Sequence, residues 1–339
     1  MAAERVGLSY ASDTEPGLRR VRRGKGFEYR DASGGRITKE ETLARIASLV
    51  IPPAWDDVWI CADPQGHLQA TGRDARGRKQ YRYHRDWHEA RSESKYGLLV
   101  PFGEALPGLR ARVEHDLGRQ GLTRDRVLAL AVSLMDETLI RVGNAEYART
   151  NGSFGLTTLR DRHAEVRGAT LTLSFRGKSG IEHALKVNDR RLARLVKQCR
   201  DLPGYSLFQY LDEEGGRQSI DSGMVNGYLR EATGDDFTAK LFRTWGGTVR
   251  AAEILASCGA PESESAAAQT EVACVKEVAE VLGNTVAVCR SHYLHPAVLD
   301  AYREGKLSAR LKRRNAGNTP AGLTPSEAAV LDLLRDAAS

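Results

Sequence analysis

The sequence predicts an α+β protein with two domains, a small and mainly β amino-terminal domain over residues 1–90 and a larger, mainly α domain over residues 91–339. Short β-rich runs separated by turn signals fill the first part of the chain. Long segments with apolar residues at three- and four-residue spacing fill the second part. With 339 residues, the chain is long enough for each domain to bury its own core.

The first domain should contain one helix and several short strands. Residues 1 to about 35 show no helical period, and we expect an irregular lead into the first strand. Thr38 as N-cap and Glu41 three positions later form a capping box, which predicts a helix that ends before Pro52. The turn at residues 63–66 predicts a hairpin. The expected strands are Gly26–Arg30, Asp57–Ala62, His67–Thr71 and Tyr81–His84.

The second domain should be mainly helical. The expected helices are Phe102–Gln120, Thr123–Arg141, Asn188–Cys199, Ser222–Ala232, Ala239–Ala256, Thr270–Leu282 and one after Pro325. Three strands are expected at Thr157–Arg160, Ala169–Phe175 and Ile181–Val187. The turn between the last two places Lys178 at the tip of a hairpin. Residues 259–269 are rich in Ala, Ser and Glu and are expected to form an exposed connector.

The composition, with 41% apolar and 28% charged residues, is typical of a soluble globular protein. No run of about 18 apolar residues exists, so we expect no membrane span. The first residues contain no apolar stretch of the secretory type. The five cysteines are scattered and never spaced as C-x-x-C, which favours reduced thiols in the cytoplasm over disulfides or a zinc site.

The net charge of +6 is concentrated in two patches, which indicates a polyanionic partner. Between Arg73 and Arg85 there are six basic residues and one acid, with Gln80, Tyr81 and Tyr83 interleaved. A second run of five cations lies between residues 306 and 314. Cations follow phosphates while amide and aromatic side chains reach base edges, a combination suited to nucleic acid. The alternative for each patch is an ordinary solvated surface.

Two motifs that suggest other chemistry are incomplete. Gly177 and Lys178 resemble the end of a phosphate-binding loop, but Thr172 stands where that motif needs a glycine, so no nucleotide site is expected. His84 and His88 have the spacing of a helical zinc pair but lack the glutamate and a third ligand. We therefore expect neither a metal nor another cofactor.

The most informative residue is Tyr293. A tyrosine hydroxyl has an ordinary pKa of about 10 and is a weak nucleophile unless cations favour its phenolate. Alone, such a residue is more often a half-buried aromatic with its hydroxyl in water. Four polar residues precede it, in the order Arg141, Lys178, Arg243 and Asn284.

Two arginines, a lysine, a neutral donor and a tyrosine in this order resemble a type IB DNA topoisomerase, in the small poxvirus-like form of bacteria. The resemblance covers nearly the whole chain and extends to the segment around Gln80 and to the nine-residue spacing from Asn284 to Tyr293. It implies a catalytic domain of the tyrosine recombinase and type IB topoisomerase fold. Two positions depart from the family pattern: Asn284 replaces a histidine, and Ser179 replaces an acidic residue.

The resemblance also implies the reaction: relaxation of supercoiled duplex DNA by transient single-strand cleavage through a 3′-phosphotyrosine, without ATP or an obligatory metal. Tyr293 would be the nucleophile, Lys178 the general acid, and Arg141, Arg243 and Asn284 the groups that hold the phosphate oxygens. The matching DNA contacts are Arg76, Arg78, Gln80, Tyr81, Tyr83, Tyr147 and Lys240. We expect a monomer in the cytoplasm, at the bacterial nucleoid.

Two other functions stay open at the level of sequence. A tyrosine recombinase uses a similar set, but its second arginine normally lies in a His-x-x-Arg motif, whereas Lys240 stands three positions before Arg243 here. A DNA-binding module without catalysis would use both basic patches and give Tyr293 no special role.

Overall fold

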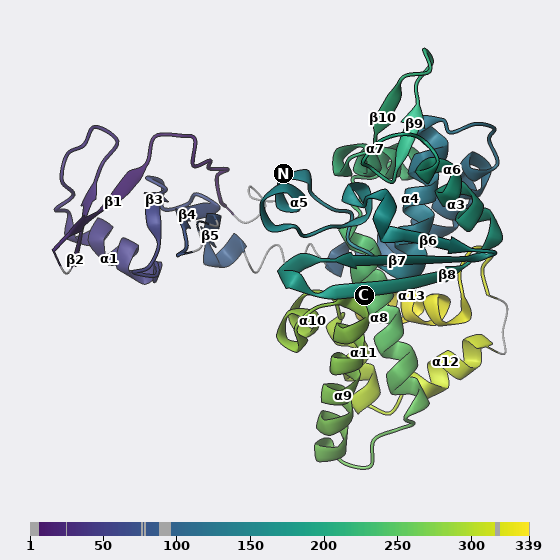
Figure 1. Ribbon diagram of the computed structural model, residues 1–339. Coiled ribbons are helices and arrows are strands. Elements are labelled where there is room, and N and C mark those ends of the chain that lie inside the picture. The colour runs from purple at the N-terminus through teal and green to yellow at the C-terminus, as the bar shows by residue number, and fades with distance from the viewer. Residues whose placement is uncertain are drawn as a thin grey trace. The chain divides into compact units, whose positions relative to one another are not determined.

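The computed structural model describes residues 7–24, 26–75, 77, 79–87, 96–315 and 319–338. The chain divides into two compact units, Met1–Gly97 and Leu98–Ser339. The first is built on a β-sheet and the second is mainly helical, so the predicted α+β class is confirmed (Figure 1).

The first unit is an antiparallel five-stranded sheet with one helix. Its strand order is β2-β1-β3-β4-β5. The strands are β1 (Leu18–Arg23), β2 (Gly26–Arg30), β3 (Asp56–Ile60), β4 (Leu68–Arg73) and β5 (Lys79–Tyr83), and the helix is α1 (Glu40–Ser48). Ile46 of this helix packs with Leu18, Val58 and Ile60 of the sheet in the core of the unit. The predicted β3–β4 hairpin is confirmed, with Gly66 N donating to Asp63 O at its turn.

Two predictions for this unit are wrong. Strand β1 lies inside the predicted irregular lead, because its four arginines conceal the strand pattern. One of them, Arg20, is held by the carbonyls of Ile51, Pro52 and Trp55, so tertiary contacts accommodate its charge. The N-cap of α1 is Lys39 instead of Thr38, and it makes no side-chain cap hydrogen bond.

The core of the second unit surrounds helix α8. Its longer helices are α3 (Leu99–Leu117), α4 (Arg124–Thr138), α6 (Arg190–Arg200), α7 (Ser222–Thr233), α8 (Lys240–Ser257), α9 (Glu264–Leu282), α11 (Pro296–Arg303), α12 (Leu307–Asn315) and α13 (Pro325–Ala338). Helix α8 packs against α9, α11, α12 and α13 (Figure 1). On the α3 side, Phe102 meets Phe242 and Trp245 edge to face. Among the described residues, no helix is both long and apolar enough to span a membrane.

The smaller elements of this unit include those that carry Tyr293 and Lys178. They are the helices α5 (Ala145–Asn151) and α10 (Val286–His292), the sheet β6 (Ala164–Arg167), β7 (Thr170–Arg176) and β8 (Glu182–Asn188), and the ribbon β9 (Gln209–Leu211) and β10 (Arg217–Ser219). The sheet has the order β6-β7-β8, and β7 and β8 form the predicted hairpin around Lys178.

Several segments of the second unit differ from the predictions, and helices α5, α11 and α12 and strand β6 were not predicted. The expected strand Thr157–Arg160 is a 3₁₀ turn (Leu156–Thr158), because Thr157 hydrogen-bonds to Val142 O through both its N–H and its hydroxyl. The ribbon of β9 and β10 was not predicted. The expected connector becomes helix α9 at Glu264, where the Ser263 hydroxyl accepts from Ala266 N and an alanine-rich run favours the helix.

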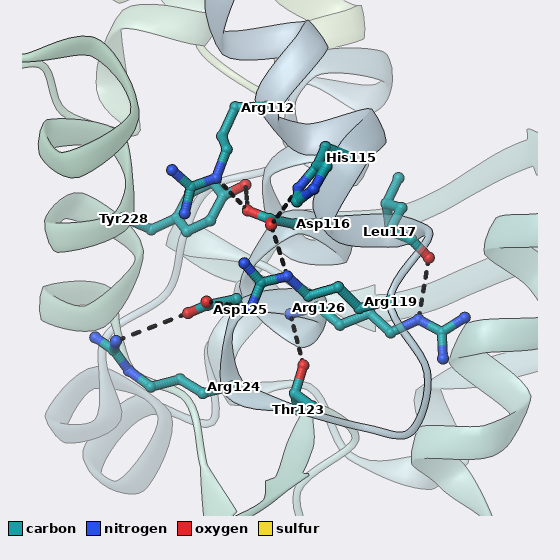
Figure 2. Close-up of polar contacts among 10 residues, drawn as sticks. All are labelled: Arg112, His115, Asp116, Leu117, Arg119, Thr123, Arg124, Asp125, Arg126 and Tyr228. Carbon is teal, nitrogen blue, oxygen red and sulfur yellow. Dashed lines mark hydrogen bonds and ion pairs between the residues drawn. The ribbon is translucent and has the colours of Figure 1, made fainter.

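A buried carboxylate organises the ends of α3 and α4 and their contact with α7 (Figure 2). The side chain of Asp116 is fully buried and accepts from Arg112 Nε at 2.6 Å, Arg119 Nε at 2.9 Å and the Tyr228 hydroxyl at 2.9 Å. Burial alone would raise the pKa of Asp116, but these donors lower it overall. A charged network thus joins helices α3, α4 and α7.

Candidate active site

Tyr293 lies at the carboxyl end of α10, against helix α8. Thr285 caps this helix by accepting from Val288 N, and Tyr293 N donates to Cys289 O at 3.0 Å. On the α8 side, Thr248 Oγ1 donates to Tyr293 O at 3.3 Å. A Cβ atom at Gly247 would lie only 2.9 Å from Tyr293 O, so glycine is required for this close approach. The backbone of Tyr293 is therefore fixed on both sides.

Arg243 of α8 is a buried cation beside this tyrosine. Its side chain is only 4% exposed, and its Cζ lies 5.1 Å from the centroid of the Tyr293 ring. Nη1 donates to Leu139 O at 2.5 Å and Nη2 to Leu282 O at 2.7 Å. These carbonyls close the ends of α4 and α9, where helices leave acceptors without partners and carry partial negative charge. Among the described residues, the guanidinium is therefore held in place by carbonyls and not by a carboxylate.

Arg141 follows α4 and brings a second cation to the same place. Its Nη2 donates to Gly283 O at 3.0 Å and to the Asn284 side-chain oxygen. Burial, and then the neighbouring charge of Arg243, lowers the pKa of the Arg141 guanidinium to about 10. The group still carries its charge at neutral pH. Two cations are thus kept near each other, an arrangement that an anion would stabilise.

Asn284 follows Gly283, which ends α9 in the left-handed conformation with φ of 56°. The side-chain oxygen of Asn284 accepts from Arg141, and its Nδ2 is buried with no hydrogen-bond partner among the described residues. Arg243 Nε is also buried, and it too has no hydrogen-bond partner among the described residues. Because buried donors normally have partners, each of these two nitrogens is available to an acceptor atom of a bound ligand.

These charges act on the Tyr293 hydroxyl. Burial raises the pKa of this hydroxyl. The charge of Arg243 and a hydrogen bond from it lower the pKa, as do the charges of Arg141 and Lys240, and together they outweigh burial. The pKa of Tyr293 therefore lies below its usual value. The structure brings Arg141, Arg243, Asn284 and Tyr293 together as one group.

Lys178 is not part of this group in the structure. It lies at the exposed tip of the β7–β8 hairpin, where Ser179 and Gly180 adopt positive φ angles of 63° and 78°. The described residues provide no hydrogen bond or ion pair to its ammonium group. A long flexible side chain on a hairpin tip remains available to a bound ligand.

The expected DNA contacts lie in both units. In the first unit, Tyr81 and Tyr83 of β5 stack at 6.1 Å with an interplanar angle of 11°, which confirms that they share one face. Gln80 Nε2 donates to Asp74 Oδ2 at 3.0 Å. Arg76 and Arg78 lie outside the described residues. In the second unit, Tyr147 of α5 is 54% exposed. Lys240 is exposed at the start of α8 and contributes positive charge to Tyr293.

The sequence analysis did not select His183 of β8, although it lines a small cavity together with Arg141 and Arg243. Its position five residues after Lys178, on the returning strand of the same hairpin, was the available signal. Among the described residues, no group of three or more His, Cys, Asp or Glu side chains could hold a metal ion.

Comparison with known proteins gives consistent matches over both units. Residues 84–316 match the eukaryotic DNA topoisomerase I catalytic core, and residues 26–74 match the bacterial DNA topoisomerase IB N-terminal domain. DNA topoisomerase 1B of Acanthamoeba polyphaga mimivirus is 30% identical over 294 residues, which cover 85% of this chain and 88% of the relative. DNA topoisomerase 1B of vaccinia virus (strain Western Reserve) is 24% identical over 239 residues, covering 69% and 72%.

These matches favour the topoisomerase interpretation over the recombinase and over a binding module without catalysis. They include the segment with the cationic group around Tyr293 and residues 26–74 of the first unit. The chain belongs to the type IB DNA topoisomerase family, and it is an enzyme that acts on DNA.

Proposed function

We propose that this enzyme relaxes supercoiled duplex DNA by cutting one strand with Tyr293, holding the end as a 3′-phosphotyrosine, and resealing it. The observation that carries the proposal is the packing of the buried Arg243 guanidinium 5.1 Å from the Tyr293 ring, with Arg141 beside it. This arrangement lowers the pKa of the hydroxyl and supplies charge for a phosphoryl group under attack.

The cleavage step involves one bond formed and one broken. The Tyr293 oxygen gives its proton to solvent and attacks the phosphorus, so that the Tyr293 O–P bond forms. The P–O5′ bond breaks, and O5′ takes a proton from Lys178. Religation is the reverse reaction, in which the 5′ hydroxyl attacks and the tyrosine leaves. Because the phosphotyrosine conserves the energy of the phosphodiester, no ATP is needed. We expect protein cations to take the charge-stabilising role that metal ions have in other phosphoryl-transfer enzymes.

Arg141, Arg243 and Asn284 would bind the nonbridging oxygens of the phosphate. Arginine provides a permanently charged donor fork whose geometry fits phosphate. The buried donors Arg243 Nε and Asn284 Nδ2 are the groups that a phosphate oxygen would satisfy. Asn284 takes the place of the family histidine as a neutral donor, so the charge in this site comes from the two arginines.

Lys178 would act as the general acid that protonates the leaving 5′ oxygen. Its ammonium is a compact donor on a flexible stem, and the hairpin tip presents it to a ligand. In this assignment, DNA binding brings Lys178 to the group around Tyr293. The proton then passes from Lys178 Nζ to O5′ as the P–O5′ bond breaks.

Binding of duplex DNA would use residues of both units. Arg76, Arg78, Gln80, Tyr81 and Tyr83 belong to the first unit, and Tyr147 and Lys240 to the second. One chain contains the complete set of proposed residues, so we propose a monomer that acts at the nucleoid without a nucleotide. We also keep residues 1–90 and 91–339 as the proposed limits of the two domains.

The experiment is relaxation of a supercoiled plasmid in EDTA without ATP, with Tyr293→Phe measured in parallel. We expect the wild-type enzyme to relax the plasmid. The variant should lose relaxation while its salt-sensitive DNA binding persists, because only the nucleophilic oxygen has been removed. Relaxation by the Tyr293→Phe variant would show that another residue is the nucleophile. DNA binding without any relaxation by the wild type would favour the binding module.

Lys178 has a separate test with two single-turnover substrates that differ in the leaving atom, 5′ oxygen or 5′ sulfur. A thiolate leaves without a proton, so Lys178→Ala should cleave the oxygen substrate slowly and the sulfur substrate at nearly the wild-type rate. Equal slowing on both substrates would contradict the role of Lys178 as acid.

A further inference from the structure

His183 is packed inside the hairpin that carries Lys178. It lies on β8 directly opposite Phe175 of β7, and the two rings stack at 5.0 Å with an interplanar angle of 17°. The imidazole also lines the cavity formed with Arg141 and Arg243. The proposed mechanism gives this side chain no role.

One edge of the His183 ring lies between two glycines, Gly177 and Gly283. A Cβ atom at Gly177 would lie 2.6 Å from His183 Cδ2 and 2.7 Å from Nε2. At Gly283, a Cβ atom would overlap Cε1 and lie 2.9 Å from Nε2. The same ring edge therefore contacts the hairpin and the end of α9, and any larger residue at either glycine would displace it.

Each glycine directly precedes a proposed active-site residue. Gly177 precedes Lys178, and Gly283 precedes Asn284. The Gly283 carbonyl also accepts from Arg141 Nη2 at 3.0 Å. The ring of His183 is therefore a spacer between the segment that carries the general acid and the segment that binds the phosphate.

The surroundings favour a neutral imidazole. Burial, and then the charges of Arg141 and Arg243, lower the pKa of His183, with only Glu182 of its own strand acting in the opposite direction. An imidazolium here would repel both arginines. The ring thus acts through its shape and packing.

We propose that His183 is a positioning residue for Lys178: its ring fixes the hairpin tip against the Gly283 segment, so that Lys178 reaches the leaving 5′ oxygen once DNA is bound. The proposal rests on the proposed function of Lys178. Misplacement of a catalytic group by about 1 Å can reduce a rate by about 100-fold. The effect should therefore fall on the step that needs the acid.

The test measures single-turnover cleavage by the full-length His183→Ala variant on the 5′-oxygen and 5′-sulfur substrates. We expect about 10- to 100-fold slower cleavage of the oxygen substrate and a change of less than about 3-fold with sulfur. The result is a ratio of two rates for one preparation, so a partly folded sample does not change it. The double variant His183→Ala/Lys178→Ala should be no slower than Lys178→Ala on the oxygen substrate.

A second variant approaches the same contact from the hairpin. Gly177→Ala adds a methyl group against the His183 ring at a position without positive φ, and it should show the same selective loss on the oxygen substrate. In the His183→Ala background the methyl group has room, so it should cause no further loss.

The outcomes separate this inference from the proposed function. If Lys178→Ala is rescued by sulfur but His183→Ala slows both substrates equally, His183 does not act through Lys178 and the inference fails. If Lys178→Ala itself is not rescued, the assignment of the acid fails first. Independent, multiplicative effects in the double variant would also overturn the inference.

Discussion

At the scale of single residues, the main feature is a buried arginine that has no acidic partner in the part of the chain that the structure describes. Arg243 is held by Leu139 O and Leu282 O, so its charge is compensated by the partial charges of two helix ends. A carboxylate at the same place would compete with the phosphate. Backbone carbonyls orient the cation and leave its positive charge available for a ligand.

We predict that Arg243→Lys will slow cleavage by about 100-fold or more, because an ammonium group cannot donate to both carbonyls and also present a planar fork to phosphate. The measurement is single-turnover cleavage of a suicide duplex, with binding affinity measured in parallel. Arg250→Lys, on the exposed part of the same helix, is the matched control and should cleave normally. A near wild-type rate for Arg243→Lys would show that charge without bidentate geometry is sufficient.

At the scale of elements, Tyr293 depends on the close contact of α10 with α8. Gly247→Ala should slow cleavage by at least about 10-fold, because the new methyl group would push against the Tyr293 backbone, and catalysis is sensitive to such displacements. DNA binding should be unchanged. Gly227→Ala in α7 is the control, since its Cβ meets nothing within 4 Å, and it should leave cleavage intact while slightly stabilising the helix. Equal cleavage by both variants would contradict the packing argument.

The charged network of Asp116 predicts a pH-dependent contribution to stability (Figure 2). The pKa of Asp116 is lowered in the folded state, so its contribution is present above the unfolded value of about 3.9 and is lost as the pH falls through the folded value. Asp116→Asn should cost about 2 kcal/mol at pH 7, because Tyr228 and two arginines lose a charged acceptor.

The measurement for Asp116 is urea unfolding of wild type and variant at pH 7 and below pH 4. The difference in unfolding free energy should shrink at the lower pH, where the wild-type carboxylate takes up its proton. Glu213→Gln, at an exposed turn, is the control and should show no such dependence. A difference that stays constant with pH would mean that the charge of Asp116 is not what stabilises the network.

At the scale of the whole molecule, the two units divide chemistry and DNA binding unequally. The proposed catalytic residues all belong to the second unit, whereas the basic patch around residues 73–85 belongs to the first. Arg76→Ala/Arg78→Ala should therefore weaken binding and reduce the slope of log affinity against log salt by about 2, one for each phosphate that is no longer neutralised.

Titration of DNA binding at several salt concentrations measures this slope. A control pair, Lys197→Ala/Lys276→Ala, removes two cations from exposed positions on α6 and α9 and should leave the slope unchanged. An unchanged slope for the Arg76 and Arg78 variant would mean that this patch is an ordinary solvated surface.

The sequence predictions were correct where an element is stabilised by residues close to it in the sequence. Helices such as α4 and α6 were predicted because the spacing of their apolar residues is visible within a short window, and the structure adds N-caps at Thr123 and Asp189. Strand β1 was missed because its arginines are accommodated by distant carbonyls, and the Thr157 turn was missed because its partner is Val142. Interactions between residues remote in sequence leave no periodic signal.

The same distinction applies to the site. The sequence alone determined the α+β class and the family resemblance, and it selected Tyr293, Arg141, Arg243 and Asn284, because these depend on residue chemistry and order. Only the tertiary structure decided that Arg243 is held by the ends of α4 and α9, that two buried donors are left without partners among the described residues, and that His183 lies between Gly177 and Gly283. Burial and helix-end charge arise from segments that meet only when the chain has folded, and they set the electrostatics of the tyrosine.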